Sequence, residues 1–186
     1  MVVSNHPMGS AAGLEMLSMG GNAIDAAIAT VFALSVVEPM MVGPFGGGYI
    51  NLRTADGESV CIDNYTLAPA AATPDMYRPV SDTWPDYLQT EDRESQVGYL
   101  AVGVPGNLKA WEELHSEYGK LSWETIIAPA IRYAEKGFPA SEYLVRLITE
   151  NREDIGRFPA TAEIFLPGGS PPVPGELIVR RDYAES

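Results

Sequence analysis

The stretch that decides the fold runs from Val37 to Pro69 and reads VEPMMVGPFGGGYINLRTADGESVCIDNYTLAP. Alternating polar and apolar residues over 49–53, followed by Asp-Gly turn chemistry, predict a β-hairpin whose second strand covers 59–63. Three consecutive glycines, 46–48, precede the first strand. Glycine weakens a strand unless some group must approach the backbone closely, so this run indicates a bulge, a crowded strand crossing or a functional site.

The segment that leads into this stretch is expected to be a buried helix over 23–37. Asn22 is a suitable N-cap, and Asp25 lies in the first turn, where a carboxylate is favoured. The sequence IDAAIATVFALSVV is apolar on nearly all sides, which is typical of a helix buried all round. A helix followed by two strands suggests a sheet covered by helix on at least one face.

The N-terminal residues predict a strand followed by a helix. Residues 1–5 are expected to form a short strand that ends at His6-Pro7, since the residue before proline favours extended geometry. A helix over 10–19 is then expected to present Leu14 and Leu17 on one face. Downstream, caps and helical spacing predict further helices over about 107–118, 124–136 and 141–152, and a final helical turn at 181–186.

A long polar segment covers 69–96 and contains prolines, the aromatics Tyr77, Trp84 and Tyr87, and the acidic cluster of the chain. That cluster comprises Asp82, Asp86, Glu91, Asp92 and Glu94. Loops of this length are usually either functional or disordered. We expect 79–96 to be mobile or to lie over a substrate cleft.

Composition excludes several classes of protein. A net charge of −13 argues against nucleic acid and anionic membrane as partners, because phosphate contacts require clustered Lys and Arg. No run of 18 apolar residues predicts a transmembrane helix, and no secretory signal is visible, although an upstream leader remains compatible with the sequence. The single cysteine, Cys61, is expected to be buried and inert.

The residues alone indicate no catalytic or metal centre. His6 and His115 have no second His or Cys at zinc-ligand spacing, and His115 is expected to lie on a solvated helix face. The glycine run lacks the Gly-Lys-Ser/Thr of a phosphate-binding loop, and no Gly-x-Ser-x-Gly elbow occurs. We therefore expect no metal and no cofactor.

Nearly the whole chain nevertheless resembles the gamma-glutamyltranspeptidases. The most specific of the shared strings are Gly20-Gly21-Asn22-Ala23-Ile24-Asp25-Ala26-Ala27, Gly46-Gly47-Gly48-Tyr49, Val102-Gly103-Val104-Pro105-Gly106 and Ala128-Pro129-Ala130-Ile131 followed by Gly137-Phe138-Pro139. The resemblance implies an α+β fold, the four-layer αββα sandwich of N-terminal-nucleophile (Ntn) hydrolases. Residues 1–186 would be the N-terminal portion of the large subunit of this fold.

The same resemblance implies a mechanism and partners. The precursor of such an enzyme cuts itself into two subunits, and the new N-terminal threonine of the small subunit is the nucleophile, with its own amine as base. None of the nine threonines here resembles that processing site, so no catalytic residue is assigned and residues 1–186 by themselves are expected to be inactive. The implied partners are a small-molecule amide substrate, the rest of the large subunit and the small subunit.

One departure from the family pattern concerns substrate binding. The family carries an Arg-Glu pair before Ala-Pro, and its arginine grips the α-carboxylate of the substrate, whereas this chain has Asn64-Tyr65-Thr66-Leu67. Tyr65 takes the place of the arginine and Thr66 that of the glutamate, so we predict Asn64, Tyr65 and Thr66 as substrate-binding residues. A phenol cannot supply the bidentate charged grip of a guanidinium. Tyr65 is therefore either a site residue or a packed aromatic at a strand end.

These observations predict part of the large subunit of a gamma-glutamyltranspeptidase-like amidohydrolase or acyltransferase. Two alternatives stay open. The first is a true gamma-glutamyltranspeptidase, a glutathione hydrolase, that binds its carboxylate by other means. The second is a non-catalytic relative that serves as a binding or structural protein. A threonine at a processing junction would distinguish the enzymes from the non-catalytic relative.

Overall fold

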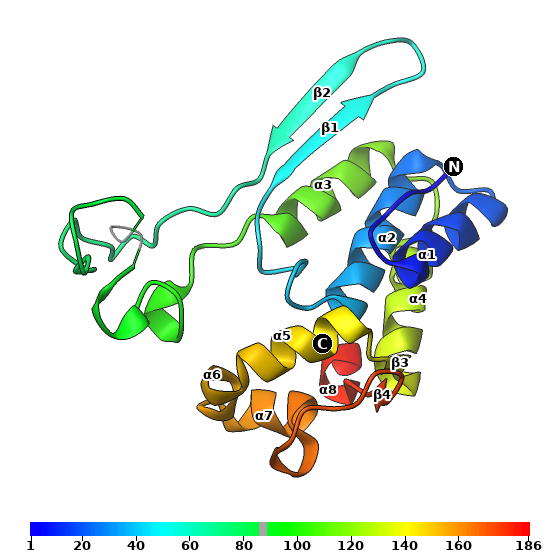
Figure 1. Ribbon diagram of the computed structural model, residues 1–186. Coiled ribbons are helices and arrows are strands. Elements are labelled where there is room, and N and C mark those ends of the chain that lie inside the picture. The colour runs from blue at the N-terminus through cyan, green and yellow to red at the C-terminus, as the bar shows by residue number, and fades with distance from the viewer. Residues whose placement is uncertain (86–88) are drawn as a thin grey trace. The chain divides into compact units, whose positions relative to one another are not determined.

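The computed structural model describes residues 1–85 and 89–186, which divide into two compact units (Figure 1). Unit 1 comprises 1–44 and 108–186, and unit 2 comprises 45–107. Unit 1 is mainly helical, whereas unit 2 holds a β-hairpin and a long irregular segment. The predicted α+β class is confirmed. Within the described residues, no helix combines the length and apolarity that crossing a membrane would require.

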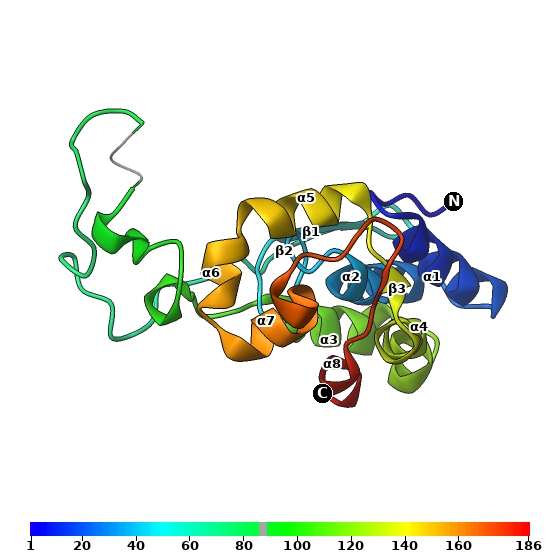
Figure 2. The same cartoon turned by 60° about the horizontal axis from the view of Figure 1, so that its bottom comes forward.

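Two N-terminal helices of unit 1 lie side by side, α1 (Pro7–Ser18) and α2 (Ala23–Val37) (Figures 1 and 2). Eleven of the 15 residues of α2 are buried, which confirms the expected burial, although Ala23 and Ala27 are exposed. The face that α1 buries consists of Gly9, Ala12, Gly13 and Met16. Small side chains on this face allow the two helices to approach closely.

The N-terminal predictions require correction. Residues 1–5 form no strand, and the backbone N–H of Ser4 instead donates to Ser10 Oγ at 3.1 Å. Helix α1 begins at Pro7 because proline suits the first helical position, and His6 Nδ1 caps it by accepting from the N–H of Met8. Leu14 is 58% exposed, so it does not belong to the buried face.

Asp25 ties the start of α2 to a distant loop of the same unit. Its carboxylate is fully buried and accepts the backbone N–H of Asn22, while Asn22 Oδ1 accepts from Asp25 in a capping box. The second carboxylate oxygen accepts the N–H groups of Lys120 at 2.9 Å and Leu121 at 3.2 Å. Because these backbone donors satisfy the carboxylate, its burial stabilises the fold.

His115 belongs to the same cluster, and the expectation that it is a solvated surface residue was wrong. Its Nε2 lies 2.8 Å from the carbonyl oxygen of Leu121 and 3.9 Å from Asp25 Oδ1, and its side chain is 16% exposed. Its ring also packs edge-on against Trp123, with the centroids 5.2 Å apart. The acidic neighbours of His115 in the sequence gave no sign of this packing, because they lie on the other face of the helix.

The other elements of unit 1 surround an apolar core. They are α3 (Asn107–Tyr118, whose first residue belongs to unit 2), α4 (Trp123–Lys136), α5 (Glu142–Glu150), α6 (Arg152–Gly156), α7 (Pro159–Phe165), η4 (Pro167–Gly169) and α8 (Arg181–Glu185), with β3 (Phe138–Pro139) antiparallel to β4 (Leu177–Ile178). Ser122 and Ser141 cap α4 and α5, as their helical patterns predicted. Phe138 is fully buried in the core with Leu144 and Ile148.

Arg180 caps the opposite end of α2. Its Nη1 donates to the carbonyl oxygens of Ser35 at 2.9 Å and Val36 at 3.2 Å, and its guanidinium lies 4.0 Å from the ring centroid of Tyr183. Burial lowers the pKa of Arg180, an effect that Tyr183 and Asp182 oppose. A guanidinium stays charged at neutral pH even so, and a cation is favoured at a helix C-terminus.

Unit 2 is built on the predicted hairpin, in which β1 (Tyr49–Arg53) pairs antiparallel with β2 (Ser59–Asp63). Inward and outward residues alternate along both strands. Cys61 lies on the exposed face, so the expectation of a buried cysteine was wrong. The alternation that predicted the strand assigns no face to solvent, because that choice depends on what the hairpin packs against.

The polar segment after the hairpin contains two short 3-10 turns, η2 (Glu91–Arg93) and η3 (Tyr99–Ala101). An isolated bridge joins Pro79 to Thr90, and Trp84 is exposed. Asp86 and Tyr87 of the predicted acidic and aromatic segment lie outside the described residues. Mobility of 79–96, or its position over a cleft, stays a prediction.

Replacement of Asp25 by Asn should destabilise the protein. An amide has one acceptor oxygen where the carboxylate has two, and its NH₂ would face backbone N–H groups. Hydrogen bonds to charged groups contribute about 1.5–3 kcal/mol each, so we expect a loss of that size from Asp25→Asn. Urea unfolding of the complete protein, followed by tryptophan fluorescence, measures the change.

The matched control is Glu15→Gln, which breaks the half-exposed ion pair between Glu15 and Arg132, whose charged atoms lie 2.7 Å apart. Exposed pairs contribute about 0–1 kcal/mol, so this variant should unfold at nearly the wild-type urea concentration. Equal destabilisation by both substitutions would contradict the special role assigned to the buried carboxylate.

Candidate functional site

Three segments of unit 2 converge where the hairpin ends: 46–48, 64–67 and 103–107. Gly48 and Asn64 exchange two backbone hydrogen bonds, which extend the hairpin ladder by one residue pair. The carbonyl oxygen of Gly46 accepts the N–H groups of Gly106 at 3.0 Å and Asn107 at 3.1 Å. Residues far apart in the sequence thereby form one layer of backbone, and the predicted substrate-binding residues lie in its central segment.

Close backbone approach explains two glycines of this layer. A Cβ added to Gly47 would lie 2.4 Å from the amide nitrogen of Thr66 and 2.8 Å from the carbonyl carbon of Tyr65. A Cβ on Gly106 would lie 2.3 Å from the carbonyl oxygen of Asn64. The glycine run therefore marks a crowded crossing of backbone, one of the three interpretations that the sequence allowed. Gly48 is different, because nothing lies within 4 Å of its added Cβ.

Asn64 occupies the interior of this layer. Its side chain is 7% exposed, and its Nδ2 donates to Asn107 Oδ1 at 2.7 Å. Its Oδ1 is enclosed by protein and has no hydrogen-bond partner among the described residues. Asn64 thus lies beside the other predicted site residues, but its amide faces inward.

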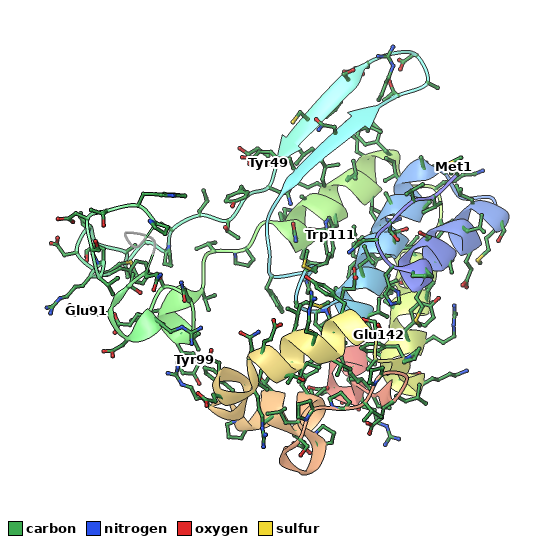
Figure 3. The ribbon with its side chains drawn as sticks, viewed as in Figure 1. Met1, Tyr49, Glu91, Tyr99, Trp111 and Glu142 are labelled. Carbon is green, nitrogen blue, oxygen red and sulfur yellow. The ribbon has the colours of Figure 1, made fainter. Side chains whose placement is uncertain are left out.

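Tyr65 projects outward from the same layer. Its ring is 60% exposed and stacks on Tyr49, which is 64% exposed, with the centroids 5.8 Å apart and the planes at 26°. Figure 3 shows the Tyr49 side chain at the start of β1. The backbone of Tyr65 is fixed by a hydrogen bond from its N–H to Asp63 Oδ1 at 3.1 Å. The two tyrosines form an exposed aromatic pair, whose stacking is worth about 0.5–1.5 kcal/mol beyond the buried area.

Thr66 and Leu67 complete the central segment. Leu67 exchanges two backbone hydrogen bonds with Val104, of 3.1 Å and 2.8 Å. Thr66 is half-buried and lies against Gly103. A Cβ added to Gly103 would lie 3.2 Å from the Cβ of Thr66. Residues 64–67 are consequently held at both ends, at Asn64 by Gly48 and at Leu67 by Val104.

The contacts of Tyr65 within the described part of unit 2, with Tyr49 and Asp63, include no cation. The three arginines of unit 2 are Arg53, Arg78 and Arg93. Arg53 pairs with Ser59 at the far end of the hairpin, four residues or about 13 Å from Tyr49, and its guanidinium lies near the turn at Gly57. Arg93 bonds Gln96, and Arg78 lines an acidic cavity. None of the three replaces the guanidinium that the family pattern puts at the position of Tyr65.

Two cavities are lined by residues outside this layer. One, of about 320 Å³ in unit 2, is lined by Asp75, Met76, Arg78, Glu91, Asp92 and Glu94. The other, of about 480 Å³ in unit 1, lies among α6, α7 and η4. Across residues 1–85 and 89–186, no group of three or more His, Cys, Asp or Glu side chains is arranged to hold a metal ion. Neither cavity contains a predicted site residue.

Comparison with known proteins now identifies the family. The family model described as gamma-glutamyltranspeptidase matches residues 9–186. The chain belongs to the gamma-glutamyltranspeptidase family. The match extends over the converging segments of unit 2 and over all of unit 1 except the first eight residues, and it confirms the resemblance seen in the sequence.

Individual members of the family agree. The Acylase ACY 1 proenzyme of Pseudomonas sp. (strain V22) is 50% identical over 186 residues, which are 100% of this chain and 33% of that protein. The glutathione hydrolase proenzyme of Bacillus subtilis (strain 168) is 40% identical over 189 residues, covering 100% of this chain and 31% of that protein. The chain therefore spans about a third of the length of the curated relatives it matches.

A solved member of the family confirms the fold. The crystal structure of Helicobacter pylori gamma-glutamyltranspeptidase matches 100% of this chain and 52% of its own, with a TM-score of 0.90 and 34% identity. The chain is thus part of the αββα sandwich that the resemblance implied. The sequence predicts Asn64, Tyr65 and Thr66 as substrate-binding residues, and that stays a prediction. It did not single out their partners Tyr49 and Asn107, because these contacts are revealed by no local pattern.

A pair of glycine substitutions tests how closely the backbone at Gly47 approaches Tyr65 and Thr66. Gly47→Ala would force a methyl group against the backbone of Tyr65 and Thr66, and such overpacking costs typically about 1–3 kcal/mol. Gly48→Ala, one residue away, should cost little, because its Cβ meets nothing. Thermal unfolding of the complete protein compares the two variants. Equal midpoints for both would contradict the close approach.

Proposed function

We propose that residues 1–186 are the N-terminal portion of the large subunit of an amidohydrolase or acyltransferase made as a self-cleaving precursor. Relatives named as proenzymes match the whole of this chain with about a third of their own length, which supports the assignment to one part of a longer protein. The partners would be the rest of the large subunit and the small subunit. That small subunit would supply the threonine nucleophile, so residues 1–186 by themselves should hydrolyse no amide.

The proposed substrate is an amide whose acyl group lacks the amino-acid carboxylate of a γ-glutamyl group at the position facing Tyr65. The observation that carries this proposal is the exposed Tyr49–Tyr65 pair where the family pattern has an arginine. The phenol oxygen of Tyr65 has no hydrogen-bond partner among the described residues and is therefore free to meet a ligand. An aromatic face with a hydroxyl suits a neutral acyl chain better than a carboxylate.

The names of the relatives also support a substrate with a neutral acyl group. Identity is 50% with a protein named as an acylase and 40% with one named as a glutathione hydrolase. Glutathione hydrolysis is the second candidate, because a family member 40% identical over the whole chain carries that name. Thr66 would then have to bind the substrate through neutral hydrogen bonds, which are weaker than charge-assisted ones.

Substrate preference of the complete, processed enzyme tests the proposal. We expect wild type to give a higher kcat/KM with a neutral acyl anilide, such as butyryl 4-nitroanilide, than with γ-glutamyl 4-nitroanilide. Tyr65→Arg should shift the ratio towards γ-glutamyl by about ten- to a hundredfold, since a charge-assisted pair contributes roughly 1.5–3 kcal/mol. The double variant with Thr66→Glu should shift it further, because the glutamate holds the new guanidinium in place.

The control is Tyr65→Phe, which keeps the stacked ring and removes only the hydroxyl. A wild type that strongly prefers the γ-glutamyl anilide, together with a Tyr65→Phe variant that behaves like wild type, would mean that Tyr65 only packs. Glutathione hydrolysis would then be the better assignment. Precursor processing, seen as two bands on a gel, verifies that each variant has matured.

A further inference from the structure

The side chain of Asn64 is committed to the protein interior. Its amide nitrogen is used by Asn107 at 2.7 Å, and its amide oxygen is enclosed by protein. A substrate could reach neither atom without disrupting the layer of backbone that surrounds them. Asn64 was predicted to bind substrate directly, and this geometry points to a different role.

The contact between the two asparagines joins segments that are 43 residues apart. Asn107 is anchored by its backbone N–H on the carbonyl oxygen of Gly46. Asn64 is anchored by its pairing with Gly48, and its carbonyl oxygen lies against Gly106. The side-chain hydrogen bond thus links the beginning of the segment 64–67 to Asn107, in addition to the backbone pairing of Asn64 with Gly48.

The next two residues inherit their positions from this anchor. Tyr65 follows Asn64 directly. Among the described residues its ring stacks on Tyr49, and its backbone N–H donates to Asp63 Oδ1. Thr66 lies one residue before the Leu67–Val104 pairing. A small displacement of Asn64 therefore moves the exposed ring of Tyr65 and the half-buried side chain of Thr66, and a misplacement of about 1 Å at a site is costly.

We propose that Asn64 and Asn107 form an amide clamp that positions Tyr65 and Thr66 and so helps to set acyl specificity without touching the substrate. This inference rests on the proposed function in one respect only, namely that Tyr65 and Thr66 contact the acyl group. Both asparagines are positioning residues, and neither is catalytic. Asn64 donates in the clamp and Asn107 accepts.

The direction of the hydrogen bond allows an isosteric test. Asn107→Asp keeps an acceptor for Asn64 Nδ2, and its charge lies on a half-buried residue at the first position of α3, where a carboxylate is favoured. Asn64→Asp removes the donor and buries a carboxylate at a position where Oδ1 has no hydrogen-bond partner among the described residues, which is costly. Two substitutions of the same size and charge should therefore have opposite outcomes.

The experiment measures the ratio of kcat/KM for butyryl and γ-glutamyl 4-nitroanilide, with precursor processing and thermal midpoint, in the complete protein. We expect Asn107→Asp to keep the wild-type ratio and midpoint. Asn64→Asp should change the ratio by about tenfold, as expected for one lost hydrogen bond at a specificity site, or should fail to mature. Loss of specificity in Asn107→Asp with none in Asn64→Asp would overturn the clamp as described.

The alanine variants keep the proposal testable if Asn64→Asp does not mature. Asn64→Ala and Asn107→Ala should each change the ratio in the same direction, and the double variant should change it no further, because both remove one shared contact. If the processed alanine variants keep the wild-type ratio, the two asparagines contribute only to packing. A shift confined to Asn64→Ala would indicate direct contact with the substrate. Either result would overturn the proposal.

These outcomes are separate from those that test the proposed substrate. If wild type prefers the γ-glutamyl anilide, the substrate assignment fails, whereas the clamp stands as long as both alanine variants move the ratio together. If wild type prefers the neutral acyl group and neither variant changes the ratio, the substrate assignment stands and the clamp fails.

Discussion

The close passage of the backbone at 64–66 against Gly47 and Gly106 is the constraint on which the candidate site depends. Added Cβ atoms at these two glycines would come within 2.4 Å of Thr66 and 2.3 Å of Asn64. Backbones can lie this close only where no side chain separates them. The approach lets Gly46, Gly48 and Val104 hydrogen-bond neighbouring segments, so an irregular stretch after a strand becomes as well fixed as a sheet.

In unit 1, the main constraint is that the polar backbone groups at both ends of the apolar helix α2 need hydrogen-bond partners. The first turn of α2 is satisfied by its capping box with Asn22, and the Asp25 carboxylate binds the loop at Lys120 and Leu121. The last carbonyl oxygens are satisfied by Arg180. Each charge matches the helix dipole at its end, which is a favourable interaction. The backbone donors to Asp25 and the guanidinium of Arg180 both come from positions more than 90 residues away in the sequence from the groups that they bind.

Function follows from combining a fixed backbone with a changed side chain. The segment 64–67 is held by close approach to glycines and by backbone hydrogen bonds, and neither depends on which side chains stand at 65 and 66. Tyr65 and Thr66 can therefore replace an arginine and a glutamate while the backbone keeps its course. Under the proposed function, this exchange would alter selectivity at a site whose scaffold is retained, and a family that includes proteins named as acylases and as glutathione hydrolases is consistent with such exchange.

The sequence by itself determined the family, the α+β class, the hairpin and the longer helices, because caps, turn residues and periodicity are short-range signals. Helix 23–37 was predicted with its observed bounds, whereas the strand predicted over 1–5 does not form. Only the tertiary structure decided which side chains are buried. His115 is half-buried and Cys61 exposed, both against expectation, since burial depends on what packs over a residue. The inward amide of Asn64 and its partner Asn107 are likewise set by chain crossing across 43 residues, which no local pattern encodes.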